Sequence, residues 1–331
     1  VYIIQQFNCI YSRGVKMFFK YIDGKRLVLV ILIIIYLLFF TAAVSAESSK
    51  VIFNHLDGIG DDYGPGGYSY PQNKIFQDKG HLFDIKSLTI FENKSEFIFR
   101  FSFSHLTDPW GAEFSFSLPL IELYIDNDLG GSNQLFQKGA NVRFQSDFYW
   151  NKFLKISGWW VRVFNPDSQK ENLLNINELT LAEPYSVENL NLSKENNTLY
   201  LRVPKTEIVS LENSKILLMI GSFDPFGYDY FRSLSKDKAS WQILSTNEVE
   251  IKKAPRVLDI LVPGGESQKE ILSGAIPEVP YLRVQTPAVE REKNLVDHLM
   301  TVNKRSISIS IVYILLIIFI IYKFNYKRKK Q

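Results

Sequence analysis

Apolar and polar positions alternate along much of the chain between Lys50 and about Ser245, as they do in strands with one buried face. The clearest example is the pair Phe83–Phe91 and Glu96–Phe103, which a polar turn at residues 92–95 separates. Helical periodicity is nearly absent before Ser267. Further strands are predicted at Ile121–Asp126, Asn141–Phe144, Phe153–Phe164, Leu199–Val203 and Lys215–Ser222. Several short alternating strands predict an all-β fold, an antiparallel β-sandwich in which each sheet buries one face.

The pattern changes after Ala254. Five prolines fall between residues 255 and 287, with Gly264 and Gly265 among them, and this composition favours an extended spacer. Glu266–Ser273 is predicted to form one short helix, and residues 289–305 read as a charged, weakly helical stalk. The predicted boundaries are therefore a sandwich over 47–253 and an extension with stalk over 254–305.

Both ends of the chain carry apolar segments. Residues 27–46 are apolar, follow Lys25 and Arg26, and end in Val44-Ser45-Ala46, which predicts a leader of residues 1–46 with a signal peptide. An uncleaved signal anchor is the alternative. Residues 306–322 hold no charge and precede a basic tail at 323–331, which predicts one C-terminal transmembrane helix with its tail in the cytoplasm. The expectation is a single-pass type I protein of the cell membrane with an extracellular body.

The charge distribution argues against one class of function. The net charge is +3, but residues 1–46 carry +4 and residues 323–331 carry +5, so residues 47–322 carry −6. An acidic body argues against nucleic-acid binding, which needs a clustered positive surface. The single cysteine, Cys9, lies in the leader, and neither H-E-x-x-H nor G-x-S-x-G occurs, so catalysis is not expected.

A glycine-rich acidic segment at Asp57–Pro71 is the most distinctive local sequence. Asp57, Asp61 and Asp62 supply hard oxygen atoms within one short loop, which suits calcium. The alternative is a solvated turn whose aspartates accept hydrogen bonds from backbone donors. Asp126 and Asp128, which follow a predicted strand, leave the same two interpretations open.

Aromatic residues offer a second kind of site. Trp110, Trp159, Trp160 and Tyr68 are candidates for stacking on sugar rings, with packing in the core as the alternative for each. If Trp159 and Trp160 lie in a strand, they point to opposite faces. Sequons at Asn93, Asn191 and Asn196, all at predicted turns, predict surface N-glycosylation.

Taken in order, the motifs resemble the C-terminal module of glucodextranase over about Lys50 to Arg283. They are Asp61-Asp62-x-Gly64-Pro65-Gly66-x-Tyr68-x-Tyr70-Pro71, Gly80-x-x-Phe83-Asp84-Ile85, Asp108-Pro109-Trp110-Gly111, Asp224-Pro225-Phe226-Gly227 and Val257-Leu258-Asp259-Ile260-Leu261. The resemblance implies a DOMON-like sandwich similar to family 9 carbohydrate-binding modules. It also implies calcium at Asp57, Asp61 and Asp62 together with Asp84. The catalytic barrel of glucodextranase has no counterpart here, so the resemblance carries no hydrolytic activity.

The expected function is that of a non-catalytic, membrane-anchored surface module that binds an α-glucan-like polysaccharide, with calcium fixing its loops. The alternative is a structural or interaction protein that docks a cell-envelope component, a transporter or an enzyme without binding sugar.

Overall fold

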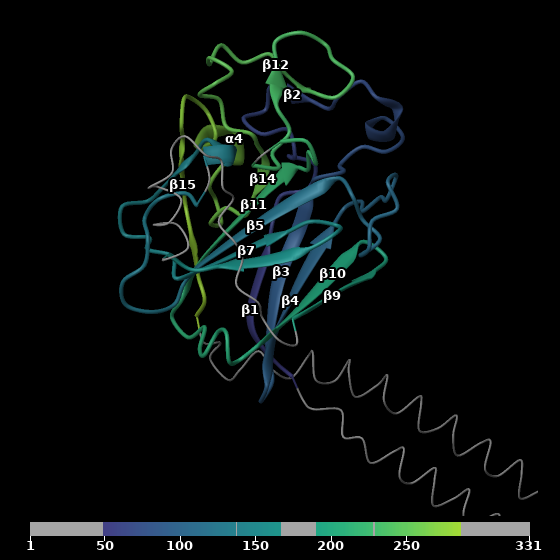
Figure 1. The fold of residues 1–331 in the computed structure, drawn as a ribbon. Coiled ribbons are helices and arrows are strands. Elements are labelled where there is room, and N and C mark those ends of the chain that lie inside the picture. The colour runs from purple at the N-terminus through teal and green to yellow at the C-terminus, as the bar shows by residue number, and fades with distance from the viewer. Residues whose placement is uncertain (1–48, 137, 167–189, 228, 286–331) are drawn as a thin grey trace, which may run out of the picture. The chain divides into compact units, whose positions relative to one another are not determined.

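A computed structural model describes residues 49–136, 138–166, 190–227 and 229–285 (Figure 1). By its contacts the chain divides into two units, residues 1–48 and 49–331, and all the described residues belong to the second. The predicted signal peptide, stalk, transmembrane helix and basic tail lie outside the described residues. Within the described ranges, no helix is long and apolar enough to cross a membrane.

The first sheet has five antiparallel strands in the order β1 (Lys50–Leu56), β3 (Ile85–Glu92), β4 (Glu96–Phe103), β10 (Thr198–Pro204) and β9 (Asn191–Glu195). One of its faces packs into the core and the other meets solvent. On β4, for example, Phe97, Phe99, Phe101 and Phe103 are fully buried, whereas Arg100 and Ser102 are half-buried. This sheet therefore produces the alternating pattern seen in the sequence.

The second sheet has the order β14 (Val257–Ile260), β11 (Lys215–Ser222), β5 (Pro119–Asp126), β7 (Lys152–Ile156) and β8 (Val161–Phe164), and β16 (Leu282–Arg283) also pairs with β11. Both faces of this sheet are buried. Ile216, Leu218 and Ile220 of β11 pack in the core between the sheets, while Leu217 and Met219 pack in a second core on the outer face. Burial on both faces explains why β11 reads as a continuous apolar run.

Shorter elements cover the rest of the sandwich. A three-stranded sheet joins β12 (Leu234–Ser235), β13 (Ile243–Ser245) and β2 (Tyr68–Ser69), and a two-stranded sheet joins β15 (Glu278–Val279) and β6 (Arg143–Phe144). The helices in the described ranges include two 3₁₀ turns, Lys74–Phe76 and Lys138–Ala140, and a short α-helix, α4 (Gln268–Ile271), which Ser267 caps. The predicted all-β class with antiparallel sheets is confirmed, and so is the short helix within Glu266–Ser273.

The single strand predicted at Phe153–Phe164 is wrong: the segment forms the hairpin β7–β8, with residues 157–160 as its turn. Gly158 in this turn has no room for a side chain, because an added Cβ would lie 1.6 Å from the Phe116 carbonyl oxygen. Trp159 and Trp160 therefore lie in a turn, and the prediction that they point to opposite faces of a strand does not apply.

Residues 254–285, predicted as an extended spacer, instead complete the sandwich. Within this segment β14 forms the edge of the second sheet, β16 pairs with the start of β11, and β15 pairs with β6. Val257, Leu258 and Ile260 are fully buried. The prediction of a spacer is wrong because the prolines lie between these short elements rather than within a continuous extended chain.

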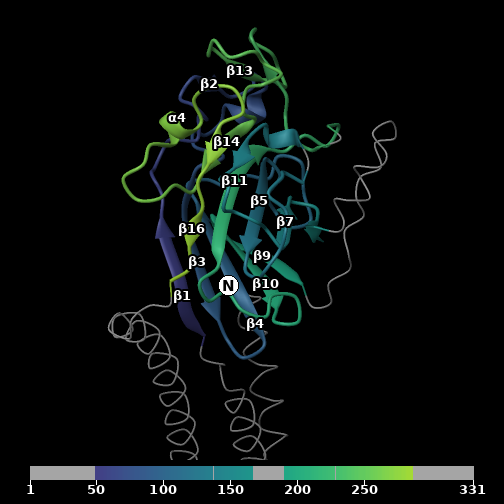
Figure 2. The same ribbon diagram turned by 90° about the vertical axis from the view of Figure 1, so that its left-hand side faces the viewer.

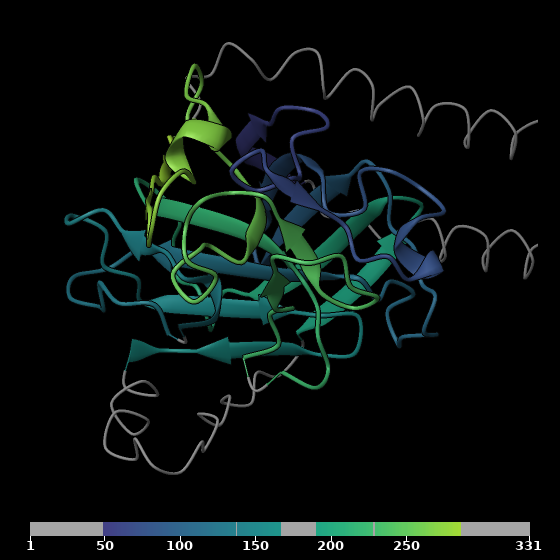
Figure 3. The same cartoon turned by 90° about the horizontal axis from the view of Figure 1, so that it is seen from above.

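The strand register places both ends of the described unit at one end of the sandwich. Lys50 pairs with Glu92, Lys215 pairs with Arg283, and a small hollow is lined by residues that include Lys50, Glu92 and Val284. We call this the proximal end, and the opposite end, where β11 and β7 finish, the distal end (Figure 2). Figure 3, which looks down on the molecule from the side of β2 and β12, shows loops from distant parts of the chain gathered at the distal end.

Candidate binding and metal sites at the distal end

Three loops bring aromatic side chains together at the distal end. Trp110 lies in the loop between β4 and β5, Trp159 and Trp160 lie in the β7–β8 turn, and Phe223 and Tyr230 follow β11. These loops meet because the start of β5 pairs with the ends of both β7 and β11. We call these five residues the aromatic cluster.

The rings of the aromatic cluster form a nearly continuous stack. Centroid distances are 6.1 Å from Trp110 to Trp159, 5.0 Å from Trp159 to Phe223 and 5.8 Å from Phe223 to Tyr230, with interplanar angles of 28°, 29° and 10°. Trp160 packs edge-on against Tyr230 at 5.0 Å. Phe223 is buried, and the other four rings are half-buried, so each keeps part of its surface open to a ligand.

The structure separates the predicted sugar-stacking residues. It brings Trp110, Trp159 and Trp160 into one cluster but places Tyr68 elsewhere, only 4% exposed, with its hydroxyl donating to the Pro255 carbonyl oxygen at 2.5 Å. The prediction for Tyr68 is wrong because its ring packs against the backbone of Gly64. Sequence reasoning did not select Tyr230, nor Phe226 of the same loop, whose side chain is 96% exposed.

Buried charges support the loop that carries Tyr230. Lys155 on β7 lies 3.1 Å from the Glu122 carboxylate, both side chains are 2% exposed, and the Lys155 ammonium donates to the Asp229 carbonyl oxygen at 2.8 Å. The Asp229 carboxylate pairs with Arg256, whose guanidinium also donates to the Phe231 and Gly139 carbonyl oxygens. Burial raises the pKa of Glu122 and lowers that of Lys155, and the contact between them opposes both shifts. We call these four residues the balanced cluster.

A second group of charges contains only acids, of which Asp259 is buried and Asp57 and Asp61 are half-buried. Asp57 follows β1, Asp61 lies four residues later, and Asp259 lies on β14 in the other sheet. One carboxylate oxygen from each lies within 4.8 Å of the others, which is close enough for the three to share a cation such as Ca²⁺. Gly58 permits this approach, because a Cβ there would lie 2.9 Å from the Asp61 Oδ2 atom. We call these three residues the acid cluster.

The acid cluster contains buried oxygen atoms without hydrogen bonds. Both carboxylate oxygens of Asp57, Oδ1 of Asp61 and Oδ1 of Asp259 are buried and have no hydrogen-bond partner in the structure. Burial, and then repulsion from Asp61, raises the pKa of Asp57 to about 8, and burial raises the pKa of Asp61 and of Asp259 as well. Unpaired buried carboxylates are costly, so they need either protons or a cation.

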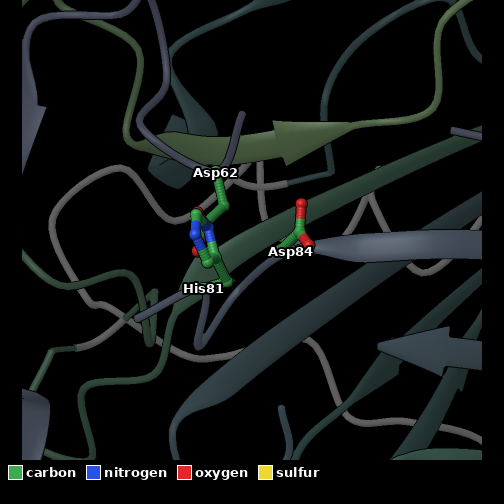
Figure 4. Close-up of side chains that lie close together, drawn as sticks. All are labelled: Asp62, His81 and Asp84. Atoms are coloured by element: carbon green, nitrogen blue, oxygen red, sulfur yellow. The ribbon is translucent and has the colours of Figure 1, made fainter. Parts of the chain in front are cut away.

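Asp62, His81 and Asp84 form a neighbouring group (Figure 4). Unlike the acid cluster, it is satisfied by protein donors. Asp62 accepts hydrogen bonds from the Tyr70 hydroxyl and from the Phe83 amide at 3.0 Å, with His81 Nδ1 3.3 Å from its other oxygen. Asp84 accepts from the Gly60 amide at 2.7 Å and from the Ser104 hydroxyl. Asp62 and Asp84 therefore fix the loop that carries Asp57 and Asp61.

Of the four predicted metal ligands, the structure brings Asp57 and Asp61 together but groups Asp62 and Asp84 apart from them. The residue that joins Asp57 and Asp61 is Asp259, which was not predicted as a ligand. Its signal was an acid in the middle of the apolar run Val257–Leu261. The second acidic segment forms a turn: Asp126 accepts from the Tyr149 amide and pairs with Lys215, and Asp128 accepts from the Leu129 amide.

The predicted glycosylation sites lie in different local structures. Asn93 lies in the β3–β4 turn, where its side-chain oxygen accepts from the Ser95 and Glu96 amides. Asn196 lies in the β9–β10 turn with φ 53°. Asn191 is exposed but begins β9 rather than lying in a turn. Glycosylation at all three stays a prediction.

Fold and site are those of a binding module: a sandwich whose distal loops present aromatic rings, with a separate group of acids between its sheets. The model of one protein family, described as the C-terminal binding-module, SLH-like, of glucodextranase, matches residues 52–281. This match covers more than half of the chain and nearly all of the described unit, so the chain belongs to that family. A search of curated proteins finds no match to the chain.

Proposed function

We propose that this protein is a non-catalytic polysaccharide-binding module whose aromatic cluster stacks on sugar rings. The observation that carries the proposal is the assembly of Trp110, Trp159, Trp160 and Tyr230, from three separate loops, into half-buried stacked rings at the distal end. The apolar face of a sugar ring packs on such rings. Phe226, in the loop that also carries Tyr230, is 96% exposed. Membership of a family of glucodextranase binding modules supports an α-glucan-like polymer as the ligand.

Calcium is the proposed occupant of the acid cluster. Asp57, Asp61 and Asp259 would hold the ion, which takes 6–8 oxygen ligands and so needs backbone carbonyls or water in addition. The unpaired carboxylate oxygens fit a cation of this kind, and no lysine or arginine pairs with these three acids within the described residues. Since Asp259 comes from the second sheet and Asp57 follows a strand of the first, the ion would join the two sheets.

The proposed location is the outer face of the cell membrane. Both ends of the described unit leave at the proximal end, so the flanking segments predicted to reach the membrane start from the same side. The aromatic cluster lies at the opposite end, which would leave it accessible to polysaccharide outside the cell.

The test is retention of the full chain, purified in mild detergent, on insoluble α-glucan. Trp160→Ala should weaken binding about tenfold, since one ring contact is lost at the edge of the stack. Tyr149→Ala is the matched control, because Tyr149 is an exposed aromatic residue near the proximal end. Soluble oligosaccharide should displace the wild type, and a chelator should weaken retention.

No retention on any of a range of polysaccharides would contradict the proposal. Capture of one cell-envelope protein, lost in the same Trp160→Ala variant, would then favour the docking alternative. If Trp160→Ala and Tyr149→Ala reduced retention equally, sugar would bind somewhere other than the aromatic cluster.

A further inference from the structure

A cation lies at the edge of the aromatic cluster. Arg162 is on β8, the edge strand of the second sheet, and its guanidinium carbon lies 4.1 Å from the Trp160 ring centroid and 5.2 Å from that of Tyr230. It donates one hydrogen bond, to the Tyr230 hydroxyl at 3.1 Å. The residue is half-buried, so part of it faces solvent.

Within the part of the chain that the structure describes, the charges around Arg162 do not cancel. Arg162 pairs in register with Lys155, and Lys155 is already compensated by Glu122, just as Arg256 is compensated by Asp229. Among the described residues, three cations therefore face two carboxylates. The uncompensated cation is Arg162, since it forms no ion pair with any described acid.

Two other arginines near the distal end have a structural role, in contrast to Arg162. Arg232 donates to the Ser222 hydroxyl and to the Trp241 and Phe223 carbonyl oxygens, and Arg256 donates to two carbonyl oxygens besides its pair with Asp229. Both use their donors to hold loops. Arg162 has five N–H donors and uses one of them within the described protein, so most of its capacity is available to a ligand.

We propose that Arg162 is an anion-recognition residue that makes this surface select sugar chains bearing carboxylate groups. The inference rests on the proposed function, because it requires a sugar ring on the aromatic cluster. The guanidinium covers one face of Trp160, so the sugar ring would pack on the neighbouring rings of the aromatic cluster and direct an equatorial carboxylate from its rim towards Arg162. The planar fork of a guanidinium binds a carboxylate through two parallel hydrogen bonds. The ligand class is therefore a polysaccharide of the proposed kind that also bears uronic-acid-type carboxylates, rather than a purely neutral one.

The experiment compares binding of the full chain to dextran, carboxymethyl-dextran and dextran sulfate of matched length. Wild type should bind carboxymethyl-dextran at least about tenfold more tightly than dextran. Dextran sulfate distinguishes the two sources of negative charge: weaker binding than to carboxymethyl-dextran assigns the subsite to carboxylates, and equal or tighter binding overturns that assignment. Poly-glutamate, a polyanion without sugar, should bind no more tightly than dextran.

Variants separate recognition from general charge. Arg162→Gln should bring the affinities for the two dextrans within about twofold of each other, while Arg162→Lys, which keeps the charge but loses the fork, should fall between. Arg202→Gln removes an equivalent positive charge from the solvent face of the first sheet, where Arg202 pairs with Glu96, and should behave as wild type. Thermal unfolding of each variant checks that it folds.

Two results would overturn the inference. One is an unchanged preference for carboxymethyl-dextran in a folded Arg162→Gln variant, and the other is tight binding to poly-glutamate. Binding to neutral dextran shows whether the anion subsite alone is wrong or whether the proposed function is wrong as well. If dextran binds and Trp160→Ala weakens it, only the anion subsite is wrong, whereas absence of binding to every dextran contradicts both.

Discussion

Two groups of buried and half-buried charged residues lie in the same sandwich and differ in how their charges are neutralised. In the balanced cluster Lys155 and Arg256 face Glu122 and Asp229, and the cations also donate to backbone carbonyl oxygens. In the acid cluster Asp57, Asp61 and Asp259 lie together, and four of their six carboxylate oxygens are buried without a hydrogen bond. One group is complete within the protein, and the other is not.

This difference indicates where the protein depends on its surroundings. A buried ion pair is stable as long as both partners stay, whereas like charges out of water need protons or an external cation. The balanced cluster should therefore respond to mutation but not to solution conditions. The acid cluster should respond to calcium and to pH.

The largest effect is expected from breaking the balanced cluster. Lys155→Met leaves Glu122 buried with the Tyr124 hydroxyl at 3.3 Å as a remaining partner, and should lower the free energy of unfolding by about 3–5 kcal/mol. Thermal unfolding of the full chain measures the loss. The double variant Lys155→Met/Glu122→Leu should recover more than half of it, because no unpaired charge remains. A double variant as unstable as the single one would contradict the description of this cluster as a balanced pair.

Removal of calcium should have the next largest effect. An ion at a concentration 100 times its dissociation constant stabilises the folded state by about 2.7 kcal/mol, which shifts the melting temperature by roughly 5–10 °C for a unit of this size. The measurement is thermal unfolding with calcium and with a chelator.

Asp259→Asn makes this test specific. The amide oxygen can still accept from the Ile85 amide, as Asp259 Oδ2 does at 2.7 Å, but the charge is lost. The variant should lose the response to calcium, whereas Glu122→Gln in the balanced cluster should keep it. An unchanged response in Asp259→Asn would place the ion elsewhere.

The dependence on pH should be smaller and should have a defined sign. In the metal-free protein the pKa of Asp57 is raised to about 8. At any pH between the ordinary pKa of an aspartate and pH 8, the folded state therefore binds more protons than the unfolded state. Stability should then fall as the pH rises from 5 to 8, by about 1–2 kcal/mol in total once solvent screening is allowed for. Calcium, which binds the ionised acids, should remove or reverse this trend. Metal-free protein that becomes more stable towards pH 8 would contradict the raised pKa.

The sequence predicted the fold better than the site, for a physical reason. Alternation of apolar and polar residues identifies strands with one solvent-exposed face, so β4 was predicted at its observed bounds. It fails where short elements follow turns: the β7–β8 turn contains two tryptophans, which favour strands, and β14 lies between prolines. Both errors come from reading local composition where pairing with distant strands decides the structure.

The candidate site shows the same limit. Asp57 and Asp61 are four residues apart and could be grouped from the sequence, but Asp259 joins them only through the packing of one sheet on the other. Likewise Trp110, Trp159 and Tyr230 meet because three strand ends lie at one end of the sandwich. Tyr68 could not be distinguished from them, because its burial depends on the backbone of Gly64 and Pro255.

The smallest effect is expected for an exposed ion pair. Arg202 lies 2.5 Å from Glu96 on the solvent face of the first sheet, with side-chain exposures of 45% and 22%. Since water already solvates both groups, Arg202→Gln should change the free energy of unfolding by less than about 1 kcal/mol, and the change should shrink further in high salt. Chemical denaturation at two salt concentrations measures it. A loss approaching that of Lys155→Met would mean that the presence of a partner, rather than burial, sets the cost of removing a charge. The contrast between the balanced cluster and the acid cluster would then need another cause.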